Sequence, residues 1–169
     1  AYEKVPHFLG AIKSAAHWAS FLVRQGQIDA HSSVQIGMRG NPRTLDWLAP
    51  STELGYEVIT MERYRSLGMS ETIKIILDRI GDVPLYITFD LDCMDPTVAP
   101  GVANIEAGVQ GFQVDEVLEL LRCVRGRNII GGDVVCMMPT KDAPNQITAH
   151  TASAVMFEII SLIADYLKA

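Results

Sequence analysis

The stretch Leu85-Tyr-Ile-Thr-Phe89, followed directly by Asp90-Leu-Asp92-Cys-Met-Asp95-Pro96, decides the fold of this chain. Residues 85–89 form a short, almost continuously apolar run, which is typical of a strand buried in a parallel sheet. Three acidic residues follow immediately. Because a charged side chain is costly to bury without a partner, these acids predict a functional site at the carboxyl end of the strand.

The rest of the chain alternates similar apolar runs with segments of helical periodicity. The other predicted strands are Val34–Met38, Tyr56–Thr60 and Ile129–Met138. The predicted helices are Ser70–Ile80, with Ser70 as N-cap and Gly81 as the stop, and the stripes Ile12–Val23, Val114–Val124 and Ala152–Leu167. This order predicts an α/β fold, with a parallel sheet covered on both faces and sites at the carboxyl ends of its strands.

Length and charge limit the function. The 169 residues suffice for a single α/β domain spanning 1–169. A net charge of −6 without a Lys/Arg cluster argues against nucleic acid and anionic membranes as partners, and permits a cationic ligand. Since no run approaches the ~20 uninterrupted apolar residues of a membrane span, we expect a soluble protein.

The cysteines and the first residues predict the compartment. Cys93, Cys123 and Cys136 form no CxxC pair, which argues against a disulfide framework or a zinc cluster and favours the cytoplasm. The chain opens with Ala1 and no basic-then-apolar leader. We therefore expect no signal peptide, and either N-terminal trimming or a piece of a longer protein.

Asp90 and Asp92 form the strongest candidate site. In an extended chain, residues two apart point to the same side, about 7 Å from one another, so the pair can hold one metal ion or bridge two. Asp95 has two interpretations. It can belong to the site, or it can cap a turn together with Pro96.

The run Thr88–Gly101 resembles the signature of the ureohydrolases, a family of arginases, agmatinases and guanidino-acid hydrolases. Val34–Gly40 and Gly132–Val135 are similar to other family segments, and agmatinase-like members are the most similar. The resemblance implies a three-layer αβα, arginase-like fold with a mostly parallel sheet. It also implies incompleteness on the N-terminal side, because the family's G-G-D-H and D-A-H-x-D segments are missing. Asp29-Ala-His31 follows a helix end, and we expect it to be a loop.

The resemblance also implies roles for individual residues. Two Mn²⁺ ions would activate water for attack on a small cationic guanidino substrate, releasing urea, with Asp90 as the bridging ligand and Asp92 as its neighbour. Asp95 would lie in the surrounding loop. His17 matches a family histidine that assists proton transfer, although taken alone a histidine in such a segment is more often a packed or surface residue. We expect His7, His31 and His150 to be structural or surface residues, and the protein to be a homo-oligomer.

One departure from the family pattern concerns the substrate. Where arginases and agmatinases carry a Glu that contacts the guanidinium, this chain has Cys136. We interpret Cys136 as a small residue lining the substrate pocket rather than as a nucleophile. Glu106, on the loop after Pro100-Gly101, could supply a replacement acid.

Three alternatives remain open from the sequence. With only Asp90 and Asp92 as metal ligands, this chain alone would bind manganese weakly and be inactive. The chain could also be a non-catalytic paralogue or subunit. A D-x-D phosphatase, with Asp133 and Asp142 as its downstream acids, is the third interpretation.

Overall fold

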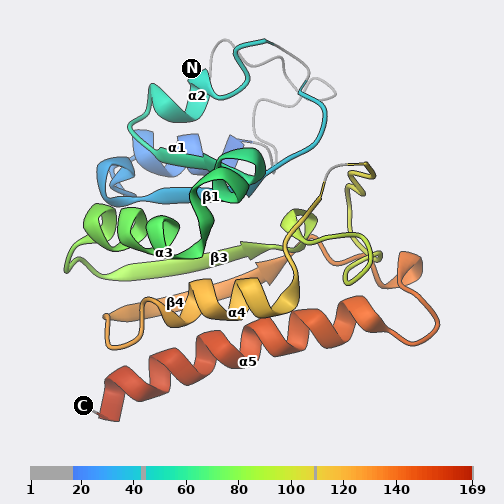
Figure 1. Cartoon of the computed structure of the whole chain (residues 1–169). Helices are drawn as coiled ribbons and strands as arrows, with labels where there is room; N and C mark the ends of the chain where they lie inside the picture. Colours follow the sequence, from blue (N-terminus) through green and yellow to red (C-terminus); the bar gives the residue numbers. More distant parts are fainter. Residues whose placement is uncertain (1–16, 43–44, 109, 169) are drawn as a thin grey trace.

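A computed structural model of the chain describes residues 17–42, 45–108 and 110–168. Its strands form two parallel pairs, β1 with β2 and β3 with β4 (Figure 1). The strands are β1 (Val34–Met38), β2 (Glu57–Thr60), β3 (Leu85–Asp90) and β4 (Ile129–Val135). In this part of the chain no ladder joins the two pairs, so the expected continuous sheet is present only as two pieces.

Helices pack against both strand pairs. They are α1 (Trp18–Arg24), α2 (Ala49–Thr52), α3 (Met61–Ile80), α4 (Val114–Arg122) and α5 (Ile147–Lys168). Short 3₁₀ turns are η3 (Ala30–Ser32), η4 (Leu91–Cys93) and η5 (Pro139–Lys141). Helix α3 packs on β1 and β2, while α5 packs on β4 and lies beside α4 (Figure 1). The α/β class is confirmed, as an incomplete αβα arrangement.

Several predicted boundaries differ from the structure: α5 begins at Ile147 rather than Ala152, and two others are wrong for a clear local reason. Strand β4 ends at Val135 rather than Met138, because Cys136 adopts a left-handed conformation (φ 66°) that an extended strand does not accommodate. Helix α3 begins at Met61, where the Thr60 hydroxyl accepts the Arg63 N–H. The predicted start, Ser70, lies inside α3, just beyond a break in helical geometry at Gly68; the predicted stop at Gly81 is confirmed.

The loop after β3 is anchored in the core. Leu91 and Met94 are both 0% exposed, and they flank Asp92 in the sequence. Their burial holds η4 firmly against the domain, because apolar side chains of this size favour burial by about 2 kcal/mol each. The Asp92 side chain is therefore presented from a well-packed turn.

Helix α5 is long and apolar enough to cross a membrane, the one helix within the described ranges with that length and composition. Its contacts are those of a core helix. Val155, Ile159 and Leu162 are buried in the hydrophobic core. Two buried threonines anchor the site loop, since Thr148 accepts the Gly101 N–H and Thr151 donates to the Val98 carbonyl. Burial in the domain accounts for this face of α5, while Phe157, Ile160 and Leu167 on the same helix are exposed.

One face of the β3–β4 pair is open. Helix α5 covers the other face, where Gly132 leaves room for Ile159, 2.8 Å from the place a Cβ would occupy. On the open face, Tyr86, Thr88 and Asp90 are all exposed. The expected cover on both faces is therefore absent from the part of the chain that the structure describes, and the open face leads to the candidate site.

Candidate metal centre

The carboxylates of Asp90 and Asp92 meet because the chain turns sharply after β3. Asp90 is the last residue of β3, and its Oδ1 accepts the Asp92 N–H at 2.9 Å, which caps η4. A turn therefore replaces the extended geometry expected from the sequence. Single ligand atoms of Asp90, Asp92 and Cys136 all lie within 4.8 Å of one another. This separation allows one cation to contact all three side chains.

Asn104 orients the carboxylate of Asp92. Its backbone N–H donates to Asp92 Oδ1 at 3.2 Å, and its side-chain Nδ2 donates to Oδ2 at 2.8 Å. A carboxylate has about four lone-pair positions, so both oxygens keep acceptor capacity for a metal ion. The role of Asn104 was not predicted from the sequence, where its only signal is its place in the loop after Pro100-Gly101.

The environment of Asp90 disfavours an isolated negative charge. The side chain keeps an exposed edge, but burial of the rest of the group raises the pKa of Asp90 above its ordinary value, while hydrogen bonds from the Asp92 N–H and the Cys136 thiol oppose that rise. The neighbouring Asp92 charge adds to the increase. A cation at this point would offset both the desolvation and the repulsion.

Cys136 contacts Asp90 from the end of β4. Its carbonyl accepts the Ala103 N–H at 3.0 Å, so it lies beside the loop that carries Asn104. Burial, together with the hydrogen bond to Asp90, raises the pKa of Cys136 to about 12. The thiol is therefore neutral near physiological pH. Its predicted place in the substrate pocket stays a prediction.

Asp95 has the geometry of a turn-capping residue. Its Oδ1 accepts the Thr97 N–H at 3.0 Å and the Thr97 hydroxyl at 2.6 Å, and its Oδ2 accepts the Gly111 N–H at 3.1 Å. These hydrogen bonds, led by those from Thr97, lower the pKa of Asp95. The carboxylate thus ties residues 95–97 to residue 111 and shapes the loop beside the site.

Glu106 lies apart from the three-residue cluster. Its carboxylate packs over Gly40, with Cδ 2.5 Å from the position a Cβ would take there. The cluster of possible metal ligands among the described residues contains Asp90, Asp92 and Cys136. The replacement-acid role suggested for Glu106 therefore has no support from this geometry and stays a prediction.

The histidines divide into different environments. His17, directly before α1, is 3% exposed, so its proton-transfer role stays a prediction. Asp29-Ala-His31 is a short turn before β1, as expected: the Asp29 carboxylate caps η3 by accepting the His31 N–H at 2.9 Å. His150 is exposed on α5. His7 lies outside the described residues.

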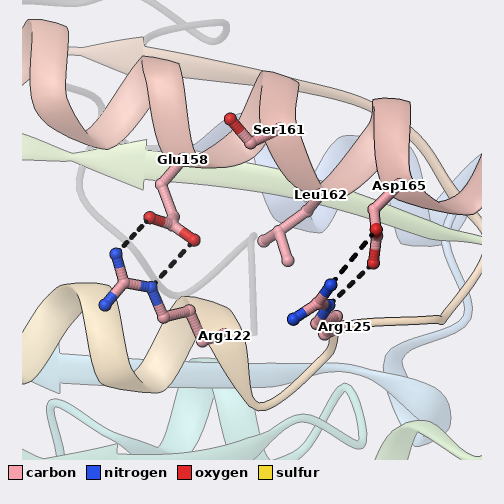
Figure 2. Close-up of a pocket in the computed structure, with 6 residues that line it drawn as sticks. All are labelled: Arg122, Arg125, Glu158, Ser161, Leu162 and Asp165. Carbon is pink, nitrogen blue, oxygen red and sulfur yellow. Dashed lines mark hydrogen bonds and ion pairs between the residues drawn. The ribbon is translucent and has the colours of Figure 1, made fainter.

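A separate hollow lies between α4 and α5 (Figure 2). Arg122 pairs with Glu158 through bonds of 3.0 and 2.8 Å, and Arg125 pairs with Asp165 through bonds of 2.7 and 3.3 Å. Each charge on the wall of the hollow is thus matched by its neighbour. These pairs join the two helices, and the metal-ligand cluster lies elsewhere, at the ends of β3 and β4.

Fold and site together define a parallel α/β domain with candidate metal-binding carboxylates gathered where its strands end. Residues 6–161 match the model of the arginase family, and the chain therefore belongs to the arginase family. It is 35% identical over 143 residues to a guanidinopropionase from Pseudomonas aeruginosa, covering 85% of this chain and 44% of that protein. It is 34% identical over 141 residues to an agmatinase from Photorhabdus laumondii, covering 83% and 42%.

The solved structures agree on the fold. Proclavaminate amidino hydrolase from Streptomyces clavuligerus superposes with a TM-score of 0.84 and 29% identity, covering 97% of this chain and 52% of that one. The arginase-like fold is thus confirmed, and family membership excludes the D-x-D phosphatase interpretation. The chain spans about half the length of the curated relatives it matches.

Proposed function

We propose that the whole protein is a metal-dependent hydrolase of guanidino compounds, with Asp90 and Asp92 as metal ligands. The observation that carries the proposal is the meeting of these carboxylates with Cys136, within 4.8 Å, at the carboxyl ends of β3 and β4. Relatives named guanidinopropionase and agmatinase support the substrate class. We further propose that the substrate is a linear, agmatine-like guanidino compound and that urea is released.

The donor set fits Mn²⁺. Carboxylate oxygens are hard ligands, which Mn²⁺ prefers to soft thiolates, and the thiol of Cys136, whose pKa is raised to about 12, stays neutral. A bound metal pair would supply positive charge and lower the pKa of a water molecule. Two carboxylates are too few for a complete site. We propose that the rest of the protein supplies further ligands over the open face, where Tyr86, Thr88 and Asp90 are exposed.

The neutral side chain at Cys136 affects substrate binding. Carboxylate–guanidinium contacts are charge-assisted, and one such contact contributes about 1.5–3 kcal/mol. If Cys136 occupies the guanidinium position, the protein lacks that contribution. We therefore expect weaker binding of the guanidinium than in a relative with an acid there.

The experiment that tests the function measures urea release by the full-length protein with Mn²⁺. Agmatine, arginine, guanidinobutyrate and guanidinopropionate are the substrates to compare. Asp90→Asn and Asp92→Ala should each lower kcat/KM by about a hundredfold or more, because each removes a metal ligand. Asp82→Asn is the matched control, since Asp82 is exposed before the start of β3. Unaltered activity in both site variants would contradict the proposal.

The replacement at Cys136 favours a second candidate, a non-catalytic member of the family. This candidate predicts Mn²⁺ binding that depends on Asp90 and Asp92, but no urea from any of the four substrates. Measuring metal binding and urea release on the same preparation therefore separates the two functions. Homo-oligomerisation and a cytoplasmic location stay predictions.

A further inference from the structure

We infer that Arg39 is a positioning residue of the candidate metal centre, because it fixes the loop of Asp92 and the loop of Asn104 relative to each other. This inference rests on the proposed function, since Asp92 matters here as a metal ligand. Arg39 directly follows β1. It therefore reaches the site from a strand pair that has no ladder to β3.

The guanidinium of Arg39 contacts two loops at once. Its Nε donates to the Asp92 carbonyl at 3.1 Å and its Nη2 to the Met94 carbonyl at 2.7 Å. Its Nη1 donates to the Glu106 carbonyl at 2.6 Å. Three nitrogens of one side chain thus bind three carbonyls, two after β3 and one in the loop that follows.

These contacts lie close in the sequence to both partners of the hydrogen bonds that orient the Asp92 carboxylate. Asn104 binds both oxygens of Asp92 and lies two residues before Glu106. Arg39 therefore restrains the backbone on both sides of the Asp92–Asn104 contact. If the two loops separated, Asp92 would lose its orienting partner and its carboxylate could rotate away from Asp90.

The end of β1 is shaped for this approach. Gly40 (φ 96°) has no side chain, and the Glu106 carboxylate packs in the space that a Cβ would occupy. The same is true of Gly37 (φ 87°), where Phe112 and Cys93 pack. Only arginine offers donors in a rigid planar fork. A lysine keeps the charge, but its single nitrogen cannot reach three separated carbonyls.

The test is Mn²⁺ binding to the full-length protein, monitored through the electron paramagnetic resonance signal of free Mn²⁺. Arg39→Lys should weaken binding by about tenfold or more, the usual effect of losing a group that orients a ligand. Arg79→Lys is the matched control, since the Arg79 guanidinium likewise binds two carbonyls, those of Ala30 and Gly55, in another part of the fold. Equal weakening by both variants would overturn the inference.

A double-mutant cycle tests the route through Asn104. Asn104→Ala should also weaken Mn²⁺ binding, and Arg39→Lys combined with Asn104→Ala should weaken it by less than the product of the two single effects. If the effects of the two substitutions on Mn²⁺ binding were independent, Arg39 would not act through the Asp92–Asn104 contact, and the inference would be overturned.

Hydrogen exchange separates this inference from the proposed function. Arg39→Lys should speed exchange in residues 91–106 by about tenfold or more without metal, whereas Arg79→Lys should leave that segment unchanged. If the wild-type full-length protein binds no Mn²⁺, the metal proposal fails, while the exchange result still decides the positioning role. Unchanged exchange in residues 91–106 of the Arg39 variant overturns it.

Discussion

The sulfur of Cys136 lies within 4.8 Å of a carboxylate oxygen of Asp90, at the ends of two neighbouring parallel strands. Cys136 lies one residue beyond β4 and has a left-handed backbone (φ 66°), a conformation that costs a non-glycine residue about 1–2 kcal/mol. The strained residue therefore lies directly beside the best candidate metal ligand, which is where backbone strain most often has a functional role.

Cys136→Glu is expected to raise the activity of the full-length protein toward guanidino substrates. The added carboxylate can form a charge-assisted contact with the guanidinium, so kcat/KM should rise by about tenfold or more at saturating Mn²⁺. Cys136→Gln, similar in shape but neutral, is the control. Equal effects of Glu and Gln would show that charge at this position is not what limits the substrate.

The cysteines should react slowly in the folded protein. The pKa is raised to about 12 at Cys136 and to about 11 at Cys123, with burial as the main cause. Allowing for the greater nucleophilicity of a more basic thiolate, Cys136 should react with iodoacetamide at pH 8 about 30–100-fold more slowly than an ordinary thiol. Mass spectrometry of quenched samples measures the rates, with the unfolded chain as reference. Rapid labelling of native Cys136 would contradict the neutral thiol.

Glu116 should make stability depend on pH in the acid range. Its carboxylate accepts bonds from Arg65 (3.0 Å), the Gln113 N–H (2.9 Å) and the Tyr64 hydroxyl (3.2 Å). The bond from Arg65 is the main reason that the pKa of Glu116 lies below its ordinary value of 4.5. The folded state thus binds the proton less tightly than the unfolded state, so this stabilisation is present above that value and is lost as pH falls through the folded-state pKa.

Glu116→Gln should therefore lower the free energy of unfolding by about 1.5–3 kcal/mol at neutral pH, and by much less near pH 3. Denaturant titrations across this range measure the difference from wild type. Glu119→Gln, at an exposed position on the same helix, should show no such trend. A difference that stays constant with pH would contradict the assignment.

Gly111→Ala should be strongly destabilising because there is no room for a Cβ, and not because of the backbone conformation. A Cβ on Gly111 would collide with the backbone of Met94 and Asp95, in the loop that carries the site. We expect a loss of about 2–3 kcal/mol in the free energy of unfolding, the cost of overpacking against atoms that cannot rotate away.

The control is Gly126→Ala, where φ is +80° and no neighbouring atom lies within 4 Å. That change should cost only the left-handed strain, about 1 kcal/mol. Denaturant unfolding of both variants gives the comparison. If the two losses were equal, the close approach at Gly111 would not be energetically important.

The amino-acid sequence by itself determined the local features of this protein. Strand β1 has the predicted bounds, and β2, β3 and α4 differ from prediction by one or two residues, because apolar periodicity and helix-stop residues act over a few positions. The closeness of Asp90 and Asp92 was also predictable, because the two residues are only two positions apart in the sequence. The left-handed conformation of Cys136 was not predicted, because a cysteine carries no signal for positive φ.

Only the tertiary structure decided which distant residues complete the site. Asn104 is 12 positions from Asp92, and Arg39 is 53 positions from it, yet both hold that one residue. No periodicity encodes such contacts, because they depend on how the loops pack once Leu91 and Met94 are buried. The local sequence thus specifies two candidate carboxylate ligands, while packing between distant segments determines how their side chains are oriented.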